Sequence, residues 1–283
     1  MNKYIILFCI MACSLIFSCT KPKTNPGSKP GVNFTYVTDS INGYQATFKN
    51  ASTGSPTSYS WNFGDASTAD TSKNPTHTYT TSGTYHVVLT ATNKAGSDTF
   101  GMNVIIYEQV VDIKTKFGDM YLWLYNETPA YKANYLKNVV THLYDSTTFH
   151  RCVPNFVIQG GDSLSKGVDQ SQAGSGGPDD LPFIYIKTLT HIYGAVGAAS
   201  LAAKGPGNNW QFYIVTNKSG DHQLDNNYTV FGFIMSGMNT ALTIQNQPQN
   251  SANNMPDTPI RMSCTILNQT KAQILANYGY TVK

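Results

Sequence analysis

The feature that most constrains the fold is a series of short, alternating segments between residues 31 and 107. Residues 32–37, 44–48 and 83–93 place apolar and polar side chains in turn, and clusters of turn-forming residues such as 50–56 separate them. A period of two puts one face of a strand in a core and the other face in water. Short strands at regular spacing therefore predict a β-sandwich domain.

A more specific pattern lies inside this segment. Residues 59–65 read Tyr-Ser-Trp-Asn-Phe-Gly-Asp, and Trp61 and Phe63 share one strand face because Asn62 lies between them. Further along the segment follow, in order, Pro75, His77, Tyr79 and Tyr85. The series resembles the PKD domain, an immunoglobulin-like sandwich, over residues 31–107.

This resemblance implies either a spacer that displays the next domain or a binder of glycans or proteins. We favour the spacer, because exposed aromatic residues do not cluster in the sequence. Asp65, Asp70 and Asp98 are also too scattered to predict a calcium site.

The pattern changes near residue 108. Residues 110–115 and 120–125 predict a β-hairpin. Pro129 opens a segment whose apolar residues recur every three or four positions, which predicts a helix with one buried face. Residues 260–266 predict a last strand, and residues 271–280 a closing helix.

The most informative segment for chemistry is 144–162, which reads Tyr-Asp-Ser-Thr-Thr-Phe-His-Arg-Cys-Val-Pro-Asn-Phe-Val-Ile-Gln-Gly-Gly-Asp. Compatible motifs follow at residues 174–178, 194–202, 208–214 and 224–232. Together they resemble the cyclophilins over about residues 109–269. The resemblance implies peptidyl-prolyl cis-trans isomerase activity and a closed eight-stranded β-barrel with flanking helices. The predicted fold is therefore mainly β, a sandwich followed by a barrel.

The resemblance also assigns candidate site residues. Arg151 matches the catalytic arginine of the family, and Gln159 matches a glutamine that contacts the substrate backbone. The other candidates for substrate binding are Phe156, Val157, Ala202, Gln211, Tyr213, Leu224 and Tyr228. Plain core packing is the competing interpretation for Phe156 and Tyr213, a surface ion pair for Arg151, and a rim position without function for Tyr228.

These residue types suit rotation about an Xaa-Pro bond. Rotation is opposed by a barrier of about 18–20 kcal/mol, because the amide nitrogen donates its lone pair to the carbonyl. In the twisted state that lone pair is localised, and a fixed guanidinium can donate to it. An apolar cup for the proline ring completes the site, and we expect no cofactor and no metal.

Three positions depart from the family pattern. Gln223 stands where cyclophilins often have a tryptophan linked to cyclosporin affinity, and Lys204 and Trp210 replace small residues around a second pocket. We therefore expect altered drug sensitivity and an unusual preference for the residue beside proline, with catalysis retained. His150 and His191 are interpreted as structural, hydrogen-bonded histidines.

The N-terminus predicts export. Residues 4–18 form an apolar run after Lys3, too short to span a bilayer and of the length of a signal-peptide core. The run ends Leu-Ile-Phe-Ser before Cys19, which resembles a bacterial lipobox, so Cys19 is the candidate lipidation site; an ordinary secretory signal is the alternative. The expected divisions are a signal peptide, a tether, two domains and a tail, at residues 1–18, 19–30, 31–107, 108–269 and 270–283.

Composition narrows the partners. The net charge of +3, from 19 basic and 16 acidic residues, is too small to predict nucleic-acid binding. Of the five cysteines only Cys152 and Cys264 belong to the predicted domains, and we favour two buried free thiols over a disulfide.

The sequence thus predicts a lipid-anchored, monomeric isomerase of the bacterial cell envelope, on the outer membrane and facing the periplasm, whose partners are proline-containing polypeptides. Two alternatives remain open. The barrel could hold Pro-containing segments without turnover, or residues 31–107 could serve in surface adhesion.

Overall fold

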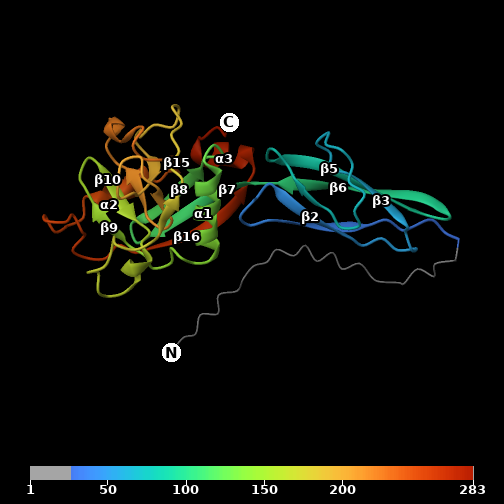
Figure 1. Cartoon of the computed structure of the whole chain (residues 1–283), viewed down its shortest axis with the longest axis horizontal. Helices are drawn as coiled ribbons and strands as arrows, with labels where there is room; N and C mark the ends of the chain where they lie inside the picture. The colour runs from blue at the N-terminus through green and yellow to red at the C-terminus, as the bar shows by residue number, and fades with distance from the viewer. Residues whose placement is uncertain (1–26, 283) are drawn as a thin grey trace.

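The computed structural model of this chain describes residues 27–282. The expected signal peptide at residues 1–18, Cys19 and most of the tether at 19–30 lie outside the described residues. Two β-rich parts follow one another along the long axis of the molecule (Figure 1). Among residues 27–282, no helix has the length and apolar character needed to cross a membrane.

The first part is a sandwich of two three-stranded antiparallel sheets, in the orders β1-β2-β4 and β3-β5-β6. Its strands are β1 (Phe34–Thr38), β2 (Gln45–Asn50), β3 (Ser58–Asn62), β4 (Thr76–Thr78), β5 (Gly83–Asn93) and β6 (Gly96–Ile106). Trp61 and Phe48 are fully buried between the sheets, with Phe63 beside them. The predicted shared face of Trp61 and Phe63 is thus the core face of this domain.

The second part is an eight-stranded antiparallel sheet, in the order β16-β7-β8-β15-β12-β14-β10-β9. Its strands are β7 (Glu108–Thr115), β8 (Gly118–Leu124), β9 (Phe149–Cys152), β10 (Val157–Gly160), β12 (Ala195–Ala198), β14 (Phe212–Val215), β15 (Val230–Ser236) and β16 (Met262–Gln269). The two edge strands meet at a bridge between Thr148 and Arg261, and Phe149 N–H donates to the Ile260 carbonyl at 3.0 Å. The sheet therefore curls into a barrel closed at this point.

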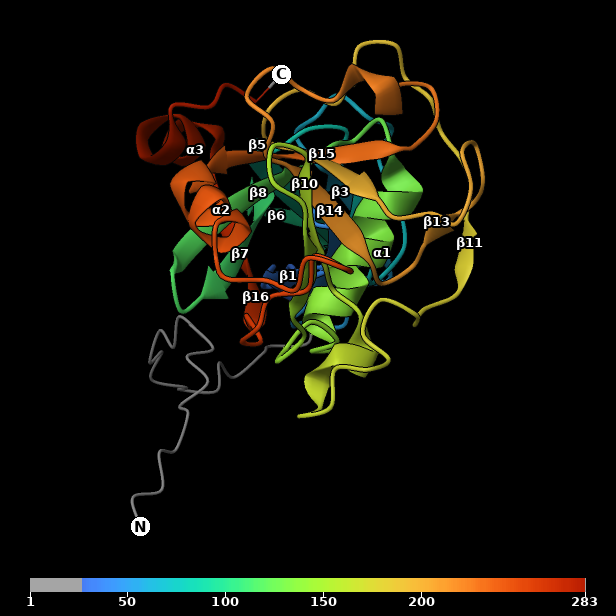
Figure 2. The same cartoon turned by 90° about the vertical axis from the view of Figure 1, so that its left-hand side faces the viewer.

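Helices cover the barrel. α1 (Pro129–Val140) and α2 (Met238–Gln245) place Tyr135 and Ile244 in the main core, and α3 (Lys271–Tyr278) packs Ile274 against the outer face of β7 and β8. Figure 2 looks into the barrel, with α2 and α3 on its left and α1 on its right. The remaining short elements are η1 (Ser163–Lys166), β11 (Asp179–Leu181), β13 (Gly207–Asn208) and η2 (His222–Leu224).

Two sequence-based expectations about this part can be compared with the structure. Pro129 is the first residue of α1, as the pattern predicts. Cys152 and Cys264 are both buried and free, as favoured from the sequence.

The two parts are joined by a polar contact around a buried carboxylate. Only Tyr107 separates β6 from β7, and such a short connection predicts interdomain motion by default. At this connection the Glu108 side chain is buried and accepts hydrogen bonds from Tyr44 Oη at 2.7 Å and Ser82 Oγ at 2.6 Å. Gln109 Nε2 also donates to the Ser40 carbonyl at 2.7 Å. Moving the domains apart would break these three hydrogen bonds, which opposes hinge motion.

Candidate active site

The candidate site is a cavity of about 210 Å³ at one face of the barrel. Its lining residues are Arg151, Phe156, Val157, Gln159, Ala199, Ser200, Tyr213, Leu224 and Tyr228. Pockets for drug-sized ligands usually measure about 300–1,000 Å³, so this cavity suits a single ring or side chain.

Strand register brings the polar and aromatic side chains together. Arg151 on β9 pairs with Gln159 on β10, and Gln159 pairs with Tyr213 on β14. Directly paired residues on neighbouring strands point to the same face of a sheet. Arg151, Gln159 and Tyr213 therefore form one row across three strands, although 62 positions separate the first from the last.

The Arg151 guanidinium is unpartnered among residues 27–282. It makes no hydrogen bond or ion pair with any of them, and its Cζ lies 5.9 Å from the centroid of the Phe156 ring. The surface ion pair considered from the sequence is therefore not formed. All five N–H donors of this fixed cation remain free for a ligand in the cavity.

Apolar side chains form the cup beside this cation. Val157, Tyr213 and Val230 are buried in one cluster, against which Phe156, Leu224 and Tyr228 pack while partly exposed. Partial exposure fits a cavity wall better than the plain core packing considered for Phe156. Tyr228 lies at the wall in an edge-to-face contact with Tyr213, with ring centroids 6.5 Å apart.

Gln211 lies behind the site and does not line it. Its side chain is 5% exposed, its Nε2 donates to the Gly174 and Gly176 carbonyls, and its Oε1 accepts from Gln159 Nε2 at 3.0 Å. Gln211 therefore fixes the Gln159 amide, whose oxygen is left to accept from a ligand N–H.

Ala202 is not brought into the cavity. The chain turns after β12 ends at Ala198, and the Ala202 carbonyl accepts from Ser200 Oγ and Gly205 N–H, which leaves Ala202 exposed in the turn. Ala199 and Ser200 line the cavity instead, and the sequence interpretation missed them. Their place directly after a buried strand that pairs with β14 is the signal that could have identified them.

His150 points away from the cavity, into the barrel wall. It is 5% exposed, and neither of its ring nitrogens has a hydrogen-bond partner among the described residues. Burial lowers the pKa of this imidazole to about 4, so it is neutral at pH 7. No group of three His, Cys, Asp or Glu side chains within the described residues could hold a metal ion.

Comparison with known proteins agrees with this geometry. A family model described as cyclophilin type peptidyl-prolyl cis-trans isomerase/CLD matches residues 110–266, which is more than half of the chain. The chain belongs to the cyclophilin-type peptidyl-prolyl cis-trans isomerases. A PKD domain model matches residues 29–105, so a PKD domain precedes the isomerase domain.

Individual relatives carry the same description. A peptidyl-prolyl cis-trans isomerase of Dictyostelium discoideum is 34% identical over 156 residues, which cover 54% of this chain and 92% of that protein. A probable peptidyl-prolyl cis-trans isomerase of Brucella suis is 33% identical over 163 residues, covering 54% of this chain and 81% of the relative. A crystal structure of a cyclophilin-type isomerase of Cryptosporidium parvum aligns with a TM-score of 0.49 at 29% identity, over 57% of this chain and 98% of that one.

Proposed function

We propose that this cyclophilin-type isomerase acts on Xaa-Pro bonds of polypeptides in the bacterial cell envelope, as a monomer held to the outer membrane through a lipid on Cys19. The observation that carries the catalytic part is the unpartnered Arg151 guanidinium beside an apolar cup. A charge left without a partner at the edge of a cavity is available to a substrate.

Arg151 is proposed to act in the twisted state of the peptide bond. The planar amide nitrogen has no free lone pair, whereas the nitrogen becomes pyramidal and localises its lone pair when the bond is twisted by about 90°. A guanidinium N–H then donates to that nitrogen. Because this hydrogen bond exists only in the twisted state, it lowers the barrier without tightening the ground state.

The remaining residues hold the substrate for that step. The cup formed by Phe156, Val157, Leu224 and Tyr213 takes the proline ring and keeps water from the guanidinium. The Gln159 amide, fixed by Gln211, accepts a backbone N–H and so orients the rotating bond. No bond forms or breaks with the protein, and the protein returns unchanged.

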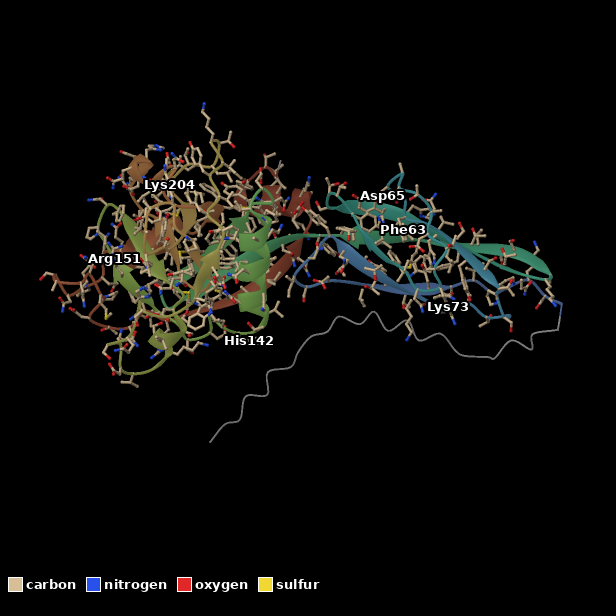
Figure 3. All side chains as sticks on the ribbon, viewed as in Figure 1. Phe63, Asp65, Lys73, His142, Arg151 and Lys204 are labelled. Carbon is tan, nitrogen blue, oxygen red and sulfur yellow. The ribbon has the colours of Figure 1, made fainter. Side chains whose placement is uncertain are left out.

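The placement of the PKD domain supports a spacer role. The Ser28 carbonyl accepts a hydrogen bond from Asn93, at the β5–β6 hairpin, whereas the other end of β6 leads into the barrel. The 11 residues of β6 span roughly 35 Å at about 3.4 Å per residue. Figure 3 shows Arg151 in the part of the molecule remote from Phe63 and Asp65. An anchor at Cys19 would thus hold the site well clear of a membrane.

The catalytic proposal is tested by NMR exchange spectroscopy on a short Xaa-Pro peptide with residues 20–283. The parent is expected to accelerate cis-trans exchange, and Arg151→Ala to lose most of the acceleration. Equal acceleration by both would overturn the role of Arg151. If neither accelerates exchange but the peptide signals shift on binding, the barrel is a binding module for Pro-containing segments.

The anchor requires a separate experiment. The full chain is expressed in a bacterium with a labelled fatty acid, beside a Cys19→Ser variant. Label and membrane fractionation are expected for the parent and not for Cys19→Ser. Export of both without label would support the ordinary secretory signal instead, and would leave the isomerase proposal untouched.

Glycan pull-down by residues 27–107 would identify an adhesion role.

A further inference from the structure

A hydrogen-bonded chain of side chains runs from the buried Tyr213 wall of the cavity through the buried His191 to the partly exposed Asp225 and the exposed His222. Tyr213 Oη lies 2.8 Å from His191 Nε2, and His191 Nδ1 lies 2.7 Å from Asp225 Oδ1. The other Asp225 oxygen lies 2.8 Å from His222 Nδ1. His191 is fully buried and Tyr213 is 6% exposed, so water does not replace these contacts.

The protonation pattern of this chain follows from the groups that face His191. Burial lowers the pKa of the His191 imidazole despite the carboxylates of Asp225 and Asp221 nearby, so it is neutral at pH 7. With a carboxylate at Nδ1, the proton resides there and Nε2 accepts from the Tyr213 hydroxyl. His191 is therefore the acceptor for a buried phenol O–H that has no other hydrogen-bond partner among the described residues.

The backbone leaves room for this arrangement at one glycine. Gly197 pairs with Tyr213 across the sheet, and a Cβ at Gly197 would collide with Cζ and Oη of Tyr213. The phenol thus passes over Gly197 to reach His191, and its ring plane is set by that contact. Rings of His191 and Tyr213 lie nearly parallel, with an interplanar angle of 16°.

Asp225 links the same histidine to the turn that carries Leu224, another lining residue of the cavity. It directly follows Leu224, and its Oδ1 also accepts the His191 backbone N–H at 2.8 Å. The Asp221 N–H donates to the His191 carbonyl at 2.7 Å. His191 therefore contacts both Tyr213 on β14 and the turn that carries Leu224.

We infer that His191 is a positioning residue of the isomerase, which holds the Tyr213 phenol against Gly197 and thereby sets the width of the cup for the proline ring. This inference rests on the proposed role of the cavity as the proline site. A leucine at residue 191 would fill a similar space but would leave the buried Tyr213 hydroxyl without an acceptor, which disfavours the present position of the ring. The Asp225 contacts with the residue 191 backbone and with His222 would remain.

The test compares His191→Leu, Tyr213→Phe and the double variant on one Xaa-Pro peptide. His191→Leu is expected to raise KM about fivefold or more with a smaller change in kcat, because binding of the ring depends on the cup. The double variant is expected to recover most of that loss, since a phenylalanine needs no acceptor. A purely structural role for His191 predicts no such recovery.

Several outcomes distinguish the possibilities. Parent-like kinetics of His191→Leu, or a double variant no better than His191→Leu, would overturn the inference. If the parent accelerates exchange no more than Arg151→Ala does in the same assay, the proposed function is overturned instead. If His191→Leu does not fold, the ¹⁵N shift of His191 Nε2 in the parent carries the test: it is expected to report an unprotonated, hydrogen-bonded nitrogen and to change when peptide saturates the site. A protonated Nε2, or no change, would contradict the inference.

Discussion

The chain contains two arginines, and they lie in regions that use the same side chain in opposite ways. At the barrel closure, Arg261 donates from Nη1 to the Ser146 and Lys166 carbonyls at 2.7 and 2.9 Å, and from Nη2 to the Gly167 carbonyl at 3.1 Å. At the cavity, the Arg151 guanidinium makes no hydrogen bond or ion pair with residues 27–282, and its Cζ lies 5.9 Å from the Phe156 ring centroid. Residue type alone therefore does not separate a cation used in the structure from one left free for a ligand; the number of acceptors within reach does.

The difference follows from what surrounds each guanidinium. Arg261 lies where two turns end and expose backbone carbonyls that no strand pairs. Arg151 emerges from the middle of a β-ladder, where neighbouring carbonyls are already used by strands. A guanidinium placed on a paired sheet face meets side chains only, and here those are mainly apolar.

The largest effect on activity is expected from a substitution of Arg151. Arg151→Ala is expected to lower kcat/KM by about 100-fold, the range seen when one donor to a developing charge is removed. Its free energy of unfolding should stay close to that of the parent, because the guanidinium makes no hydrogen bond or ion pair with residues 27–282 and only its contact with the Phe156 ring is lost. Arg151→Lys keeps the charge without the planar fork and should lie between the two. Peptide exchange by NMR measures kcat/KM, and thermal unfolding measures stability. A large loss of stability in Arg151→Ala would contradict the absence of hydrogen-bond and ion-pair partners for Arg151.

A substitution of Glu108 tests whether a buried, hydrogen-bonded charge stabilises the fold without affecting activity, as we expect for Arg261. Glu108→Ala removes the acceptor of Tyr44 and Ser82 and is expected to lower the free energy of unfolding by about 2 kcal/mol, with kcat/KM unchanged. Glu127→Ala, which removes an exposed carboxylate from the same domain, is the matched control and should change little. Denaturant unfolding is the measurement. An equal effect of the two variants would mean that the joint between the domains adds no stability.

His150, which precedes Arg151 in the sequence, is expected to make the free energy of unfolding depend on pH. Its pKa falls from about 6.5 unfolded to about 4 folded, so between these values the unfolded chain binds more protons and stability falls as the pH is lowered. The contribution is about 2 kcal/mol between pH 7 and pH 5. His150→Phe should remove that loss while remaining as stable as the parent at pH 7, whereas His142→Asn, at an exposed histidine, should leave it in place. Thermal unfolding between pH 7 and pH 5 is the measurement. If the stability of His150→Phe falls with pH as much as that of the parent, the pH dependence does not come from His150.

Arg261→Ala completes the comparison with the smallest effect. Three hydrogen bonds to carbonyls are lost, but they are solvent-exposed, so we expect a decrease of about 1 kcal/mol in the free energy of unfolding. The kcat/KM for the peptide should remain that of the parent. Loss of activity at constant stability would reverse the roles assigned to the two arginines.

Much of the architecture could be predicted from local pattern. Alternation indicated the sandwich strands, and the aromatic pair at Trp61 and Phe63 indicated its core face. Pro129 marked the start of α1. Local pattern says less where the chain turns back on itself: Ala202 was predicted to contact substrate, whereas the turn after β12 places Ala199 and Ser200, and not Ala202, along the cavity.

The sequence by itself determined the local structure and the family, because strand alternation, helix starts and ordered motifs depend on residues close together along the chain. It also identified Arg151 and Gln159 as a pair worth testing. Only the tertiary structure decided that Arg151 has no hydrogen-bond or ion-pair partner among residues 27–282 while Arg261 has three, that Glu108 accepts hydrogen bonds across the domain joint, and that His191 contacts Tyr213. These facts depend on strand register and on which groups meet across long sequence separations, and the sequence pattern around each residue carries no record of what lies opposite it.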